Sequence, residues 1–90
     1  MDHTNATWKN ENVISQLRNS VDNVMMAVGQ AQSNPTQQFI QQAQSMINRA
    51  DNALDNALQN GGHMEPIHRL QEQLDHNKEQ LQQLQSLKND

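Results

Sequence analysis

The chain has 90 residues, a formal net charge of −4 and a hydrophobic fraction of 33%, and Trp8 and Phe39 are its two aromatic residues. A chain of this length forms one small domain without room for a large enclosed site, and an aliphatic core favours packed helices over a β-sandwich or barrel. The charge divides evenly, with −2 over residues 1–60 and −2 over residues 61–90, so neither part offers the basic surface that nucleic-acid binding requires.

A first helix is predicted over residues 11–32, within a single helical domain of residues 10–90 that follows a flexible polar leader at residues 1–9. Asn10 or Asn12 is the candidate cap at its start, and Gly29 weakens its last turn. Steps of three and four residues separate the members of one buried face, which Val13 and Met25 widen. The members of that face are Ile14, Leu17, Val21, Val24, Val28 and Ala31.

The segment "SNPTQ" at residues 33–37 predicts a turn followed by a second helix over residues 35–60. Asn34 can cap this helix, Pro35 suits its first position, and Gln37 stands where the last residue of a capping box belongs.

The second helix carries a heptad pattern in which large and small side chains alternate along one face. This alternation lets a neighbouring helix approach closely. The large residues are Ile40, Ile47 and Leu54, the small ones are Ala43, Ala50 and Ala57, and Phe39, Met46 and Leu58 widen the face.

"NGG" at residues 60–62 predicts the end of the second helix, because glycine adopts the left-handed conformation that follows a last helical turn. Pro66 then opens a third helix over residues 66–88. Its stripe is interrupted by one amide, Asn77, between Leu74 and Leu81. The other members are Ile67, Leu70, Leu84 and, to one side, Leu87.

Three amphipathic helices joined by short turns predict an all-α fold, an antiparallel three-helix bundle with up-down-up topology and a length of about 30 to 38 Å. The alternative is a helical hairpin whose third helix pairs with a second copy of the chain. Asn77 bears on this choice, because a single Asn in a coiled-coil core can fix register and partner number. A homo-oligomer therefore stays open as an alternative to a monomer.

The tetrad Asp-Asn-Ala-Leu occurs twice in succession, at residues 51–54 and 55–58. One helical turn separates the two carboxylates, but acid–base catalysis requires a desolvated carboxyl group, and we expect Asp51 and Asp55 to lie on the solvated face. His68, Glu72 and His76 share one side of the third helix without a specific metal-site signature, and His63 lies just before that helix. The sequence thus predicts no catalytic residue, no metal site and no cofactor.

Five residues are candidates for contact with a partner protein. Trp8 either folds back as a cap on the bundle or stays exposed as an anchor. Met25 and Met26 are adjacent, so they cannot both face one core, and either one of them or Val13 leaves an apolar edge at the surface. Asn77 is the fifth candidate, because its amide would lie at the interface between subunits if the third helix paired with a second copy of the chain.

The chain has no cysteine, no apolar leader and no run of 18 apolar residues, which favours a soluble cytoplasmic protein that does not contact membranes. Fifteen Gln and twelve Asn make its polar surface rich in amides rather than charges.

Three segments, "NVMMAVGQAQ", "INRADNALDNALQNG" and "MEPIHRLQEQLDHNKEQLQQLQ", resemble a family of small helical proteins of unknown function from Bacillus and its relatives. That resemblance implies a helical fold and transfers no catalytic residue. Secreted hairpins of the WXG type are similar in size, but this chain has "SNPT" and "NGGH" at its turns in place of Trp-x-Gly.

We therefore expect a non-enzymatic protein-interaction module or small regulator that presents a helical face to a partner protein. One alternative is a hydrophilic stress- or spore-associated protein that acts through abundance and hydration, since mean hydropathy is −0.99. The other is a phage or host inhibitor of a larger enzyme.

Overall fold

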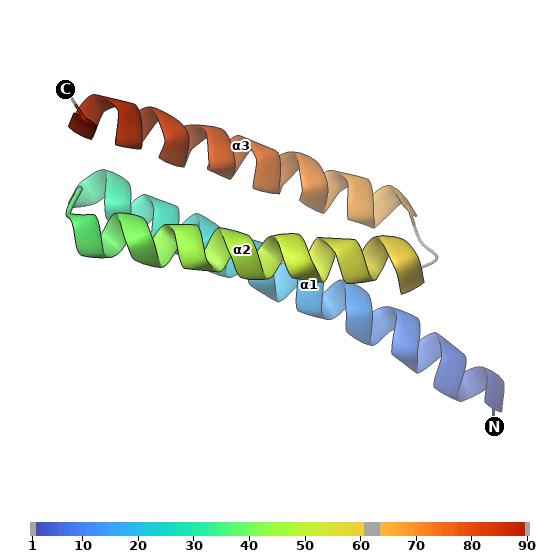
Figure 1. The fold of residues 1–90 in the computed structure, drawn as a ribbon. Coiled ribbons are helices and arrows are strands. Elements are labelled where there is room, and N and C mark those ends of the chain that lie inside the picture. The colour runs from blue at the N-terminus through green and yellow to red at the C-terminus, as the bar shows by residue number, and fades with distance from the viewer. Residues whose placement is uncertain (1, 61–63, 90) are drawn as a thin grey trace.

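The computed structural model describes the backbone of residues 2–60 and 64–89, and the side chains of residues 12–60 and 64–86. Over these ranges the chain forms three helices and no strand: α1 (Asp2–Ser33), α2 (Gln37–Asn60) and α3 (Met64–Asn89). Consecutive helices run in opposite directions, and all three pack against one another (Figure 1). The predicted all-α, up-down-up three-helix bundle is confirmed.

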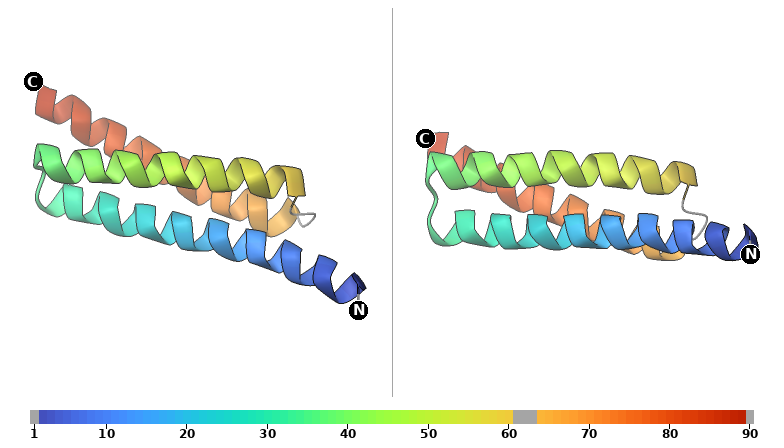
Figure 2. Two further views of the ribbon diagram at one scale, coloured as in Figure 1. Left: turned by 60° about the horizontal axis from the view of Figure 1, so that its bottom comes forward. Right: turned by 90° about the horizontal axis from the view of Figure 1, so that it is seen from below.

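Helix α1 begins at Asp2 rather than near residue 11. Residues 2–9, expected as a polar leader, form its first turns, and both candidate caps, Asn10 and Asn12, lie inside the helix. The reason is that no Gly or Pro occurs before Gly29 to interrupt the helix. The added turns extend past the end of α2 (Figure 2), and the longest axis of the molecule measures 57 Å rather than the predicted length.

Helix α2 begins at Gln37, and Thr36 is its cap in place of the predicted Asn34. The Thr36 hydroxyl oxygen Oγ1 accepts a hydrogen bond from the Phe39 backbone N–H at 3.2 Å. The Thr36 backbone N–H in turn donates to the Asn34 carbonyl oxygen at 2.7 Å, which closes a three-residue turn around Pro35. The turn places the cap one residue after the proline, so Gln37 holds the first helical position instead of the third.

Helix α3 begins at Met64, two residues before Pro66. A proline in the first turn removes no intrahelical bond, because the first four N–H groups of a helix have no partner within it. Helix α2 ends at Asn60, as predicted, while the proposed glycine stop and His63 lie outside the described residues.

The buried face of each helix matches its predicted stripe. In α1 and α2 nearly every predicted position is fully or almost fully buried, and the alanines at positions 43, 50 and 57 are each 0% exposed. These small side chains let α1 and α2 pack closely, and the two helices share the most extensive interface of the bundle. In α3 the buried residues are Ile67, Leu70, Leu74, Asn77 and Leu81, with Leu84 packed at the edge.

The flanks of the stripes differ from the prediction. Met25 and Leu58 were expected to widen the core, but each is 42% exposed. Ala27 is instead buried beside Val28, and Ala53 packs partly against the core. Each step of four residues rotates a position by about 40°, which carries Leu58 past the buried edge that Leu54 occupies.

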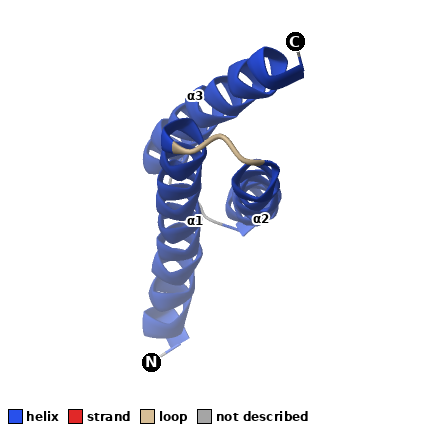
Figure 3. Ribbon diagram, turned by 90° about the vertical axis from the view of Figure 1, so that its left-hand side faces the viewer, coloured by secondary structure: helices blue, strands red, loops and turns tan. Residues whose placement is uncertain are grey.

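Helix α3 crosses the hairpin of α1 and α2 at an angle. Its C-terminal end points away from both other helices, as Figures 1 and 3 show from two directions. Its interfaces with α1 and α2 are each smaller than the α1–α2 interface. The bundle is therefore a close helical hairpin with a third helix docked more loosely on it.

Candidate protein-interaction surfaces

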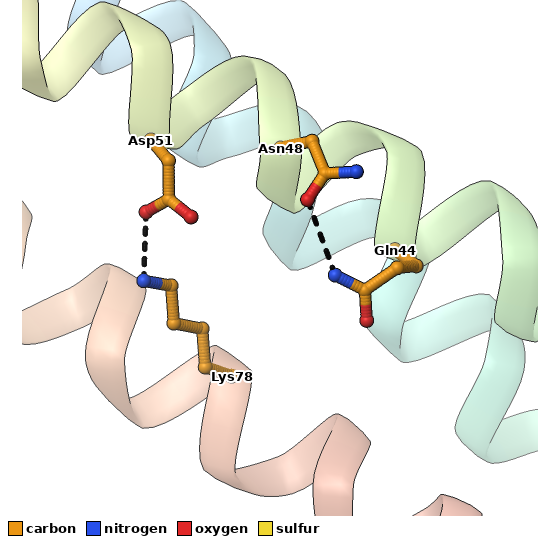
Figure 4. Close-up of polar contacts among 4 residues, drawn as sticks. All are labelled: Gln44, Asn48, Asp51 and Lys78. Atoms are coloured by element: carbon orange, nitrogen blue, oxygen red, sulfur yellow. Dashed lines mark hydrogen bonds and ion pairs between the residues drawn. The ribbon is translucent and has the colours of Figure 1, made fainter.

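The doubled tetrad does not bring two carboxylates into one site. Asp55 is exposed, whereas Asp51 lies half-buried at the edge between α2 and α3. There the Lys78 ammonium Nζ donates to the Asp51 carboxylate Oδ1 at 2.7 Å (Figure 4). The expectation that both carboxylates face away from the seam therefore holds for Asp55 and is wrong for Asp51. Both side chains of the ion pair are about two-fifths exposed, at 39% and 43%, so solvent screens much of their attraction.

The histidine cluster of α3 forms no metal site in the part of the chain that the structure describes. His68, Glu72 and His76 are all exposed. No group of three His, Cys, Asp or Glu side chains in the described ranges lies close enough to hold an ion.

A shallow groove of about 290 Å³ lies between α2 and α3, beside the ion pair. Ile47 and Leu81 contribute its apolar part, and both are almost fully buried. Its remaining lining is polar and includes Gln44, whose Nε2 donates to Asn48 Oδ1 at 3.3 Å along the same helix (Figure 4). This groove offers hydrogen-bonding amides and little accessible apolar surface.

A second groove, of about 300 Å³, lies between α1 and α2 and is lined by methionine. Met26 is 67% exposed, and Met46 is half-buried on the facing helix. Ala27 lies beside Met26, and Arg49 supplies the one charged group of the lining. The other lining residues are Asn23, Gln30 and Gln42.

The adjacent methionines of α1 point toward different neighbouring helices. Met25 contacts α3, where Gln73 Nε2 donates to its sulfur Sδ. Met26 lines the groove with α2. The divergence follows from helix geometry, because neighbouring residues point about 100° apart. The prediction that both cannot share one core is confirmed, and in fact neither is buried.

A third hollow lies at the turn between α1 and α2. Its lining includes Gly29 of α1 and Phe39 of α2. A Cβ atom placed on Gly29 would meet nothing within 4 Å. This hollow is open and carries no charged side chain, so it offers little to orient a ligand.

The structure places the side chains of four of the five predicted contact residues. Met25 and Met26 lie at the surface. Val13 is 8% exposed, because it packs in the core beside Ile14, and so it is not the apolar edge that the sequence left open. The backbone of Trp8 belongs to α1, but its side chain lies outside the described residues.

Asn77 is 5% exposed, on the buried face of α3 between Leu74 and Leu81. Its Nδ2 amide has no hydrogen-bond partner among the described residues. The amide is thus buried by residues of its own chain, and its place in a seam between two subunits stays a prediction.

Met46 and Arg49 are contact candidates that the sequence alone did not indicate. The sequence predicted Met46 only as a residue that widens the buried face of the second helix, and it did not single out Arg49. Both follow from the docking of α2 against Met26, which a single-helix pattern does not encode.

Comparison with protein-family models, with curated proteins and with solved structures found no match to the chain. In the described part of the chain, no helix combines the length and the apolar character needed to cross a membrane.

Proposed function

We propose that this chain is a non-enzymatic protein-interaction module that binds a helical segment of another protein in the groove between α1 and α2. The observation that carries the proposal is the two-thirds exposure of Met26 in a groove whose other wall holds Met46. Methionine is flexible and polarizable, so an exposed pair adapts to an apolar partner without a rigid pocket. An amphipathic helix that places apolar side chains in a shallow groove is a common partner for such a surface.

The charged group in the groove indicates which kind of partner helix fits it. Arg49 is the one ionic group in the lining, whereas the chain as a whole carries −4. The neighbouring amides of Gln30 and Gln42 can both donate and accept hydrogen bonds. The segment that fits is a helix with apolar residues on one face and a carboxylate at the edge of that face, where it reaches Arg49.

Site-specific photo-crosslinking tests this proposal. A diazirine amino acid at position 26 should give a discrete adduct in the cells that make the protein, and the adduct should map to a helical segment with an acidic residue. The same photo-reactive group at position 72 is the matched control, because Glu72 is exposed on α3 and lines none of the three grooves described above. Arg49→Glu should weaken the adduct. Equal adducts from positions 26 and 72, or no adduct from position 26, would contradict the proposal.

A further inference from the structure

The buried face of α3 contains one group that opposes its own docking. Ile67, Leu74 and Leu81 are at most 1% exposed, and Asn77 lies among them with an Nδ2 amide that has no acceptor in the described residues. An amide nitrogen that leaves water without gaining an acceptor destabilises the buried state. Helix α3 is therefore held on the hairpin less firmly than a helix with an unbroken apolar stripe.

The polar contacts of α3 do little to offset this weakness. Among the described residues, the polar side-chain contacts of α3 with the other helices are Lys78 to Asp51 of α2 and Gln73 to Met25 of α1. Both lie at the rim of the bundle, where solvent competes for the polar groups. The C-terminal end of α3 also points away from the hairpin (Figures 1 and 3).

The contact between α1 and α2 does not depend on α3 in the same way. It is the most extensive interface of the bundle, and the three alanines of α2 at positions 43, 50 and 57 are completely buried. A bundle built in this way opens first where its interface is smallest and contains an unpaired polar group.

We propose that α3 is a releasable arm, and that the surface it leaves on α1 and α2 accepts an amphipathic helix from a partner protein, with an apolar residue where α3 has Asn77. Helix α3 is then an imperfect internal ligand that covers this surface until a better-matched helix replaces it. The surface differs from the Met26 groove, so this proposal does not rest on the proposed function.

The residues that the partner helix needs can be inferred from α3, because α3 itself fits the surface on α1 and α2. The occupant carries apolar residues at the six positions that α3 uses, namely 67, 70, 74, 77, 81 and 84, and a cation where Lys78 meets Asp51. The α3 helix of a second copy does not meet this requirement, because it carries the same Asn77. It would also have to compete with a tethered helix at high effective concentration.

Hydrogen exchange on the full chain tests whether α3 is released. We expect the backbone amides of α3 to exchange faster than those in the centres of α1 and α2. Asn77→Leu replaces the amide by an apolar group of similar branched shape, and should slow exchange in α3 about ten-fold or more. His76→Leu is the matched control, because it adds the same leucine at an exposed neighbouring position and should leave exchange unchanged.

Asn77→Val serves as a second variant, in case leucine is too large for the site. Slower exchange of α3 in either variant supports the releasable arm. Equal exchange in all three helices of the wild type, or exchange in α3 that neither variant slows, overturns it.

A synthetic helix tests the occupant. A labelled peptide of residues 64–89 carrying Asn77→Leu should bind the full wild-type chain about ten-fold or more tightly than the unmodified peptide, as measured by fluorescence anisotropy. It should bind more weakly to the Asn77→Leu chain, whose own arm is held more firmly. Equal binding of the two peptides, or no binding by either, overturns the assignment of the occupant. The crosslinking experiment probes the groove at Met26, whereas the peptide experiment probes the surface under α3. Failure of one experiment therefore leaves the result of the other unchanged, and the two proposals can be tested separately.

Discussion

Replacing Gly29 by alanine should stabilise the protein. Gly29 lies inside α1, one turn before the helix ends at Ser33. Glycine in a helix interior is unfavourable relative to alanine, because its backbone loses more conformational freedom on folding. The new methyl group needs no rearrangement, since nothing lies within 4 Å of the position that its Cβ would take. Steric repulsion therefore does not offset the gain from helix propensity.

The expected gain in the free energy of unfolding is about 0.5 to 1 kcal/mol. The entropy of unfolding of a chain of 90 residues is about 190 cal/mol/K, from about 2.1 cal/mol/K per residue. Dividing the free energy by this entropy gives a rise in Tm of about 3 to 5 °C.

Thermal unfolding followed by circular dichroism measures this shift. Gln32→Ala is the matched control, because Gln32 is exposed on the same stretch of α1 and is already a good helix former. Its Tm should change much less. A Tm for Gly29→Ala that falls, or that rises no more than the control, would show that α1 is not a continuous helix through residue 29 or that the glycine has another structural role.

Ala50→Leu should lower the free energy of unfolding by about 1 to 3 kcal/mol in urea titrations, because the position is 0% exposed on the buried face of α2 and added methyl groups would overpack the core. Lys78→Gln should lower it by less than about 1 kcal/mol, since the ion pair with Asp51 is substantially exposed. Met26→Gln should change thermal stability by less than about 0.5 kcal/mol, because the side chain is largely in water. The unmodified chain should show a helical spectrum that is lost in one cooperative transition, whereas a coil-like spectrum would favour the alternative of a protein that acts by hydration.

The sequence predicted the fold well because the packing signal repeats along every helix. A residue such as Leu17 or Ile47 belongs to a periodic set, and burying one member brings the others to the same side. The heptad of α2 was predicted completely, from Ile40 to Ala57. Errors in single residues do not disturb such a pattern.

The helix ends were predicted less well, because each depends on one or two local interactions. Asn34 and Thr36 are both suitable caps, and the turn around Pro35 decides between them. Asn10 and Asn12 are suitable N-terminal caps as well. A cap acts only at the end of a helix, however, and no residue before Asn10 interrupts the helix.

The surfaces depend on how helices dock, which their individual patterns do not specify. The sequence showed that Met25 and Met26 diverge, but it did not show that Met26 would face Met46 and Arg49. It also identified Asn77 as unusual without showing that residues of its own chain bury it. In both cases the missing information is the position of a second helix.

The position of Asn77 in α3, rather than in α2, determines which part of the bundle is weak. An unpaired amide at the place of Ala50 would weaken the contact between α1 and α2, where the buried alanines let the two helices approach closely. In α3 the same group weakens a helix whose departure leaves the α1–α2 contact intact. The contact between α1 and α2 thus stabilises the domain, whereas the contacts of α3 permit the release of α3. Moving the amide should therefore change which helix exchanges first: in a chain with Asn77→Leu and Ala50→Asn, α2 should lose its slow exchange relative to α3, and persistence of the original order would show that helix position, rather than the amide, sets the weak point.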